Sequence, residues 1–307
     1  MAITSTPYDD VYRTLLNDCS SLILPVINEM FGEHYTGDEK IIFGINEHYL
    51  NQQGGEEDKR ITDTAFDVVG AQRKKYHLEC QSTEDSTMLI RMFEYDSQIA
   101  LDDGEVRGST LTVTFPHSGI LYLRHSKDTP DDMTIRIVTT GGEVSYKVKV
   151  FKTQTYTIDE IFEKKLLFLI PFYIFSHESR LRVYNEDEKS LETLKNEYEE
   201  IKKRLEELMN AGEISEFMKC TIVDMSNRVL EHIASNYENV KEGVKSVMGG
   251  SVLDYEAKDI RNGRSREIAE NLIKRGKLSF EEIAEDAGMS VSEVEKLAEK
   301  IGVLVPA

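Results

Sequence analysis

The stretch RITDTAFDVVGAQRKKYHLECQS, residues 60–82, decides how the first half of the chain is expected to fold. Residues 60–69 and 76–82 are runs of β-type residues, and the polar segment 70–75 lies between them. Two such runs around a short polar segment that contains glycine predict a β-hairpin. The tip of this hairpin is expected to be basic and to contact phosphate or simply solvent, since it ends in Arg73, Lys74 and Lys75.

The second strand of this hairpin is expected to have two different faces, because successive strand residues point to opposite sides. Its polar face carries His77, Glu79 and Gln81, and its core-like face carries Tyr76, Leu78 and Cys80. On the first strand Asp63 and Asp67 share a face, so the hairpin brings one of them near Glu79. Two carboxylates and a backbone carbonyl are hard oxygen donors that suit Mg²⁺. A solvated sheet face is the alternative reading of these acids.

The segments around the hairpin predict a mixed α/β core. Residues 86–101 place Met88, Met92, Tyr95 and Ile99 at helical spacing. Four short runs rich in β-formers follow, bounded by Gly, Pro or Asp, at 111–115, 119–124, 133–139 and 144–151.

These residues resemble the PD-(D/E)XK nuclease superfamily, in particular its recombination-promoting nuclease and transposase group. The resemblance rests on Asp63 followed by Glu79-x-Gln81, and Arg60-x-x-Asp63 favours Asp63 over Asp67. Two further matches are Asp9-x-x-Tyr12-Arg13 near the start and Arg91-x-x-x-Tyr95 after the hairpin. The tail GKLSFEEIAEDAGMSVSEVEKL, residues 276–297, is a separate and weaker match.

The resemblance implies an endonuclease that hydrolyses DNA phosphodiester bonds with Mg²⁺, or with Mn²⁺ in its place. Asp63 and Glu79 are then the metal ligands, and Gln81 takes the position of the usual lysine. Gln81 is neutral, so it can orient a water molecule but cannot neutralise charge on phosphate. Arg91 and Tyr95 support the site or contact nucleic acid, and Glu29 is a further candidate acid. The alternative is a weakly active or inactive relative that binds or assembles with partners.

Beyond residue 185 the chain reads almost entirely as helix. Residues 191–208 carry a heptad seam of Leu and other apolar residues, which indicates either a short coiled coil that dimerises through 186–210 or one arm of an antiparallel helical hairpin. Residues 265–300 follow a helix-turn-helix pattern with acidic residues in the second helix. Acidic residues repel phosphate, so a packing or partner-binding tail is favoured over a DNA reader. The expected domains are 1–185, 186–245 and 246–307.

The composition limits the classes of protein to which the chain can belong. The 307 residues carry a net charge of −19, divided almost evenly as −10 before residue 186 and −9 after it. No half of the chain is therefore a basic DNA-coating module, and nucleic-acid binding needs a local basic or metal-neutralised site. Three scattered cysteines and the absence of a signal-peptide or membrane-spanning pattern predict a soluble cytoplasmic protein. Zinc-ligand, nucleotide-binding and hydrolase-elbow motifs are absent from the sequence.

Overall fold

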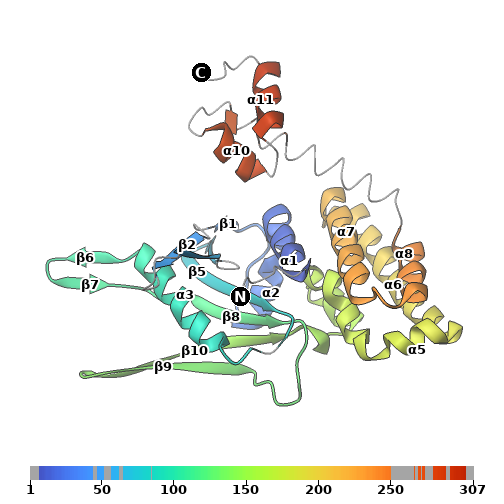
Figure 1. Ribbon diagram of the computed structural model, residues 1–307, viewed down its shortest axis with the longest axis horizontal. Coiled ribbons are helices and arrows are strands. Elements are labelled where there is room, and N and C mark those ends of the chain that lie inside the picture. The colour runs from blue at the N-terminus through green and yellow to red at the C-terminus, as the bar shows by residue number, and fades with distance from the viewer. Residues whose placement is uncertain are drawn as a thin grey trace.

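The protein is described here by a computed structural model, which covers residues 7–43, 47–51, 57–61, 65–83, 85–249, 266, 269–270, 272–273, 279–287 and 291–301. The expected mixed α/β class is confirmed, because a six-stranded sheet is combined with helices on both faces (Figure 1). Asp63, the first expected metal ligand, lies outside the described residues, and the side chain of Arg60 is likewise not described.

The central sheet has the strand order β1-β4-β5-β8-β10-β9. Its strands are β1 (Lys40–Phe43), β4 (Ala65–Val69), β5 (Arg73–Gln81), β8 (His117–Tyr122), β9 (Asp132–Thr139) and β10 (Gly142–Lys152). β4 and β5 form the predicted antiparallel hairpin, but its first strand begins at Ala65 rather than at residue 60, and residues Glu57–Ile61 belong to β3 of a separate two-stranded sheet. β5 and β8 are parallel, so the chain must cross from one end of the sheet to the other between them, and helix α3 (Met88–Asp102) lies in that crossover. Because β4 and β8 lie on either side of β5, the strand that carries Glu79 and Gln81 is an inner strand of the sheet.

The hairpin turn is shorter than the sequence suggested, which corrects the expected basic tip. Val69 pairs with Arg73 across the hairpin, so residues 70–72 form the loop. The three basic residues belong to strand β5, and all three are paired with acids: Arg73 with Asp67, Lys74 with Glu33, and Lys75 with Asp103. The β-pairing extends through these residues because their long side chains find carboxylates on neighbouring elements.

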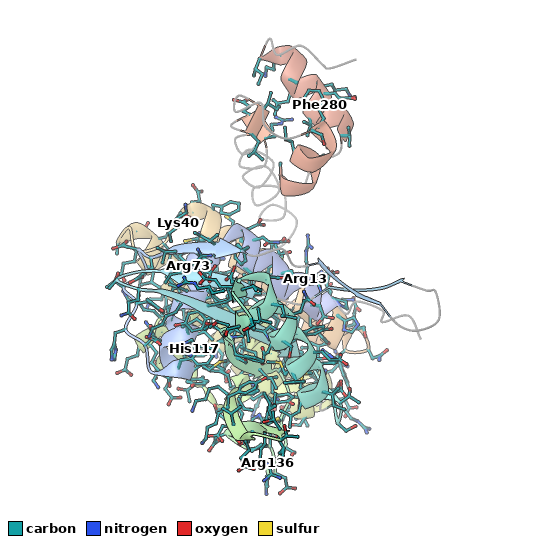
Figure 2. The ribbon with its side chains drawn as sticks, turned by 90° about the vertical axis from the view of Figure 1, so that its left-hand side faces the viewer. Arg13, Lys40, Arg73, His117, Arg136 and Phe280 are labelled. Carbon is teal, nitrogen blue, oxygen red and sulfur yellow. The ribbon has the colours of Figure 1, made fainter. Side chains whose placement is uncertain are left out.

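Each face of the sheet is covered by a different set of helices. One face is apolar and includes Tyr76, Leu78 and Cys80 of β5. It packs against α1 (Pro7–Asp18), the 3₁₀ helix η1 (Ser20–Ile23), α2 (Leu24–Phe31) and the 3₁₀ helix η3 (Leu167–Arg180). The other face packs against α3 through Met88 and Met92. In Figure 2 the ribbon of α3 lies in front of the sheet. His77 and Glu79 lie on this second face and are enclosed rather than solvated.

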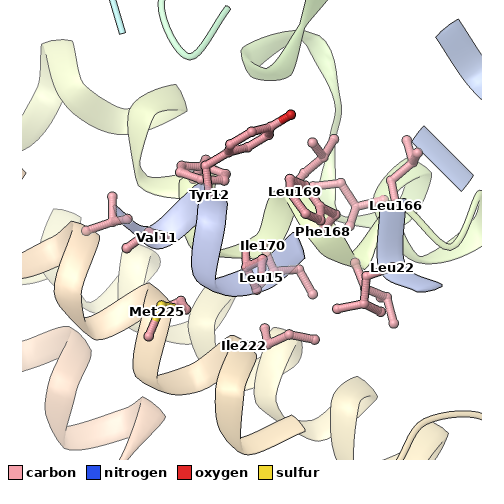
Figure 3. Close-up of a cluster of buried hydrophobic side chains, with 14 of the residues drawn as sticks. Val11, Tyr12, Leu15, Leu22, Leu166, Phe168, Leu169, Ile170, Ile222 and Met225 are labelled. Atoms are coloured by element: carbon pink, nitrogen blue, oxygen red, sulfur yellow. The ribbon is translucent and has the colours of Figure 1, made fainter. Parts of the chain in front are cut away.

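The helices after residue 180 share one core with the sheet. They are α5 (Leu181–Glu186), α6 (Glu188–Asn210), α7 (Glu216–Ile233) and α8 (Glu238–Met248). One apolar cluster runs from Tyr8 to Met248, and Figure 3 shows α1, η3 and α7 meeting in it through Leu15, Phe168 and Ile222. The boundary expected at residue 185 thus does not coincide with a break in the core.

The heptad seam of α6 is used inside the chain. Its residues Leu194, Tyr198, Ile201 and Leu205 are all buried in the shared core. The seam is thus covered within the chain, but α6 packs chiefly against α8 and α5 and less against α7, so α7 is not the main partner that the helical-hairpin alternative expected. A homodimer through 186–210 would have to compete with these contacts for the same seam.

The remaining described elements are short. Two small hairpins pair β2 (Glu47–Asn51) with β3 (Glu57–Ile61) and β6 (Glu105–Arg107) with β7 (Thr110–Thr112). The 3₁₀ helix η2 (Thr153–Thr155) and helix α4 (Ile158–Glu163) follow β10, and α4 begins with a capping box between Thr157 and Glu160.

The tail contains α10 (Phe280–Ala287) and α11 (Val291–Lys300), which pack with Ala269 and Ile273 around a small core of their own. The exposed Glu293 and Glu295 of α11 agree with the acidic second helix expected from the sequence. Among the residues that the structure describes, no helix is long and apolar enough to cross a membrane.

Candidate active site

Glu79 lies at the centre of the candidate site. It occupies the inner strand β5, opposite Ile120 of β8, and its side chain is 1% exposed. Glutamate is almost never fully buried unless it is paired, because an ionised carboxylate loses much of its hydration free energy in the interior. The solvated-face alternative is therefore excluded for this residue.

Side chains of three described residues contact the two oxygens of the Glu79 carboxylate. His77 Nε2 lies 3.4 Å from Oε1, while Arg91 Nη2 donates to Oε2 at 3.0 Å and Gln81 Nε2 donates to the same oxygen at 3.3 Å. His77 and Glu79 lie inside the protein, whereas the Arg91 side chain is 25% exposed. The carboxylate thus has one oxygen facing the interior and one facing side chains that reach the surface.

His77 is held between two carboxylates. Its Nδ1 lies 2.7 Å from Asp96 Oδ1, and its Nε2 faces Glu79. Ionised carboxylate oxygens only accept hydrogen bonds, so an N–H on each ring nitrogen satisfies both contacts. Complete burial by itself lowers the pKa of a histidine, but the hydrogen bonds to Asp96 and Glu79 outweigh it and raise the pKa of His77 to about 9. At neutral pH the ring is therefore a buried cation.

Asp96 anchors this arrangement from helix α3. Its Oδ1 also accepts from Ser118 Oγ at 2.8 Å, and its Oδ2 accepts from the Tyr146 hydroxyl at 2.8 Å. The residue is completely buried. Sequence reasoning did not select Asp96, although its position four residues after Met92 places it on the buried stripe of the helix. Ser118 and Tyr146 come from β8 and β10, and no local pattern could have grouped them with it.

Arg91 and Tyr95 of helix α3 lie next to Glu79 and His77. Arg91 also donates from Nη1 to Asp85 Oδ2 at 3.1 Å, so its guanidinium bridges Glu79 and Asp85. Interaction with Glu79 outweighs partial burial and raises the pKa of Arg91, which stays charged. Tyr95 packs edge-on against the His77 ring, with 5.9 Å between the ring centroids.

A hollow of about 490 Å³ opens beside Asp85. Its lining includes Tyr122, which pairs with Gln81 at the carboxyl ends of the parallel strands β8 and β5. Crevices at this end of parallel strands are the usual position of ligands in open α/β sheets. Asp85 connects this hollow to the site through its contact with Arg91, although Arg91, Glu79 and Gln81 are not themselves among the lining residues.

Asp67 is not part of the site. It lies on the same face of the sheet as Glu79, but its partner on β5 is Lys75. Lys75 precedes Glu79 by four residues, which corresponds to about 13 Å along the strand. Its carboxylate accepts from Arg73. Of the two candidate aspartates, Asp67 is thus committed elsewhere and Asp63 lies outside the described residues.

Glu29 is also engaged elsewhere. Its Oε1 accepts from the Tyr156 hydroxyl at 3.1 Å and from Lys164. It belongs to α2, whose Met30 and Phe31 side chains lie against Gly119 on the apolar face of the sheet. The sheet itself separates this helix from the Glu79 face.

A metal site is incomplete within the described residues. No group of three or more His, Cys, Asp or Glu side chains there is arranged to hold a metal ion. Glu79 and the amide oxygen of Gln81 are donors of the kind that Mg²⁺ prefers. The donor chemistry therefore fits Mg²⁺ in type, and a second carboxylate would have to come from outside the described residues.

Comparison with protein-family models, with curated proteins and with solved structures gives no match to this chain. The resemblance to PD-(D/E)XK nucleases therefore stays a prediction from the sequence motifs.

Proposed function

We propose that this chain is a Mg²⁺-dependent DNA endonuclease of the PD-(D/E)XK type, with Glu79 at its active site. The observation that carries the proposal is the buried Glu79 carboxylate, which shares an inner strand with Gln81 and is contacted by Arg91 and His77. Clusters of buried, mutually charged groups beside a crevice are typical of functional sites. The cytoplasm, where DNA is present and cysteines remain reduced, is the proposed compartment.

In this proposal Glu79 and Asp63 hold the metal ion, as Mg²⁺ or Mn²⁺. A bound divalent cation polarises a phosphodiester and lowers the pKa of a coordinated water molecule. Gln81 orients a water molecule through its amide group. Arg91, which is charged and partly exposed, faces the phosphate. Its Nη1 atom stays paired with the Asp85 carboxylate.

The basic residues of β5 have a smaller role. Arg73, Lys74 and Lys75 are each paired with an acid, so a phosphate must compete with a carboxylate for every one of them. With a net charge of −19, DNA binding is expected to be weak and to decrease further as salt screens the local attraction.

The test is cleavage of plasmid and single-stranded DNA with and without Mg²⁺, for the wild type and for Glu79→Gln. Cleavage is expected with the metal, with none in chelator, and Glu79→Gln is expected to reduce the rate at least about 100-fold, as loss of a central electrostatic group does. Glu197→Gln is the matched control, because Glu197 is a partly buried carboxylate that also contacts a histidine, His177. Equal cleavage by wild type and Glu79→Gln would contradict the assignment.

One observation favours a second candidate, an inactive relative that binds or assembles with partners. Both oxygens of Glu79 are already matched by the charged side chains of His77 and Arg91, which is how a structural ion-pair cluster is built. This candidate predicts a stable fold with neither Mn²⁺ binding nor cleavage. Calorimetric titration of the wild type with Mn²⁺ separates the two proposals.

A further inference from the structure

A continuous chain of polar contacts runs through the interior under α3 and ends on Glu79. It passes from the Tyr146 hydroxyl and Ser118 Oγ to Asp96, from Asp96 to His77, and from His77 to Glu79. The side chains of Asp96, His77 and Glu79 are each no more than 1% exposed. The chain links strands β5, β8 and β10 to the helix through side-chain atoms alone.

Stability alone is a poor explanation for such a chain. A buried ion pair usually adds little to stability compared with apolar side chains of similar volume, because burying the charges costs about as much as their attraction returns. The surrounding contacts on this face, such as those of Met92 and Ile120, show that apolar packing is available to the same elements. A polar chain at this place is better explained by what it does to the residue at its end.

The geometry gives His77 one function in particular. Asp96 accepts at 2.7 Å from one ring nitrogen and so fixes the plane of the ring. The other nitrogen then faces Glu79 Oε1 from the interior, while Oε2 is turned toward Arg91 and Gln81. A hydrogen-bonded group behind a ligand residue fixes that residue's orientation, as is common around metal ligands.

We propose that His77, held by Asp96, is a positioning residue that fixes the orientation of the Glu79 carboxylate. The proposal rests on the proposed function, since it concerns how Glu79 meets a divalent cation and the substrate. Neither His77 nor Asp96 touches the substrate, and both act through Glu79.

The test compares the full-length variants His77→Gln and Asp96→Asn with the wild type and with Glu79→Gln. His177→Gln is the matched control, because His177 is also buried, also contacts a carboxylate at 2.9 Å, and lies on η3. Each protein is titrated with Mn²⁺ by calorimetry, and kcat and KM for DNA cleavage are measured.

His77→Gln is expected to weaken Mn²⁺ binding about 10- to 100-fold, the usual effect of losing such a group behind a ligand. It is also expected to lower kcat at least about 10-fold while KM for DNA stays within about twofold. Asp96→Asn is expected to change both quantities in the same direction and by less. His177→Gln is expected to stay within about twofold of the wild type on both.

Three results would overturn the positioning role. In the first, His77→Gln and Asp96→Asn both bind Mn²⁺ and cleave DNA like the wild type, while Glu79→Gln is inactive. That result would leave the nuclease assignment intact. The second is an equal loss in His77→Gln and His177→Gln. The third is a wild type that neither binds Mn²⁺ nor cleaves, which removes the proposed function and the positioning role together. If His77→Gln does not fold, Asp96→Asn decides between these results.

Discussion

The chain contains two buried histidines with similar neighbours in different surroundings. His77, in the sheet, contacts Asp96 and Glu79 and packs edge-on against Tyr95. His177, in the helical half, contacts Glu197 at 2.9 Å and Tyr184 at 2.9 Å and packs edge-on against Tyr173. Each ring has a polar neighbour at both nitrogens and an aromatic side chain beside it, but the contact of His177 Nε2 with Glu197 lacks hydrogen-bonding geometry.

The two clusters differ in their access to water. The acids around His77 are at most 1% exposed, whereas Glu197 is 31% exposed. When a contact at Glu197 is lost, water can replace it, but no such replacement is at hand for Asp96 or Glu79. We therefore expect the side chains around His77 to be held in one arrangement more strictly than the side chains around His177, although the two sets of contacts look alike. Rigidity of this kind suits a site and is unnecessary at a helix packing contact.

Replacing the anchoring acid should give the largest difference between the two clusters. Asp96→Leu leaves His77, Ser118 and Tyr146 without their acceptor and is expected to lower the free energy of unfolding by about 4 kcal/mol. Glu197→Leu should cost about 1 kcal/mol or less, because its partners can reach water. Urea unfolding followed by circular dichroism measures both values. Equal losses would mean that the exposure of the acid does not matter.

The pH dependence of stability should also distinguish the clusters. The pKa of His77 is about 9 in the folded protein and lies above its ordinary value of 6.5, so the folded state binds more protons between these values. Stability from this group is therefore complete below about pH 6.5 and is lost as the pH rises through about 9, by on the order of 3 kcal/mol. Among the described residues, the groups that face the ring are Asp96, Glu79 and the Tyr95 side chain.

Glu197 should respond at the opposite end of the scale. The neighbouring His177 ring lowers the pKa of Glu197 below its ordinary 4.5, so the contribution of Glu197 to stability is present above that value and is lost as the pH falls. The free energy of unfolding, measured from pH 3 to pH 10 in buffers that contain chelator, tests both the acid loss at Glu197 and the alkaline loss at His77. The alkaline loss should disappear in His77→Gln and persist in His177→Gln. An alkaline loss of the same size in both variants would contradict the prediction.

Removing a tyrosine hydroxyl should have the smallest effect and so sharpens the comparison. Tyr146→Phe deletes one of the donors to the buried Asp96 and is expected to cost about 1.5 kcal/mol, as for a hydrogen bond to a charged group. Tyr184→Phe deletes the contact to His177 and is expected to cost about 1 kcal/mol or less. Denaturation midpoints at pH 7 give both numbers. A larger loss for Tyr184→Phe would show that the helical cluster is the tighter one.

Much of the candidate site follows from local periodicity. The hairpin, the two faces of β5 and the helix that carries Arg91 and Tyr95 were all predicted, because strand and helix repeats act over a few residues. The pairing of Lys74 with Glu33 and of Lys75 with Asp103 was not predicted, since these acids lie on elements that only the folded chain brings together. The same holds for Ser118 and Tyr146 around Asp96. The assignment of Asp63 as a metal ligand stays a prediction.

The sequence by itself determined the α3 helix and the separation of Tyr76, Leu78 and Cys80 from His77, Glu79 and Gln81. The period of two in a strand is a property of the backbone and needs no tertiary contact. Only the tertiary structure decided that α3 closes over the second set, which the sequence left open as a solvated or a functional face. Closure removes water from two carboxylates, and a charge without water needs a charged or hydrogen-bonding neighbour. For that reason His77 and Arg91 contact Glu79 and Asp96 contacts His77, although these residues are spread over twenty residues of chain.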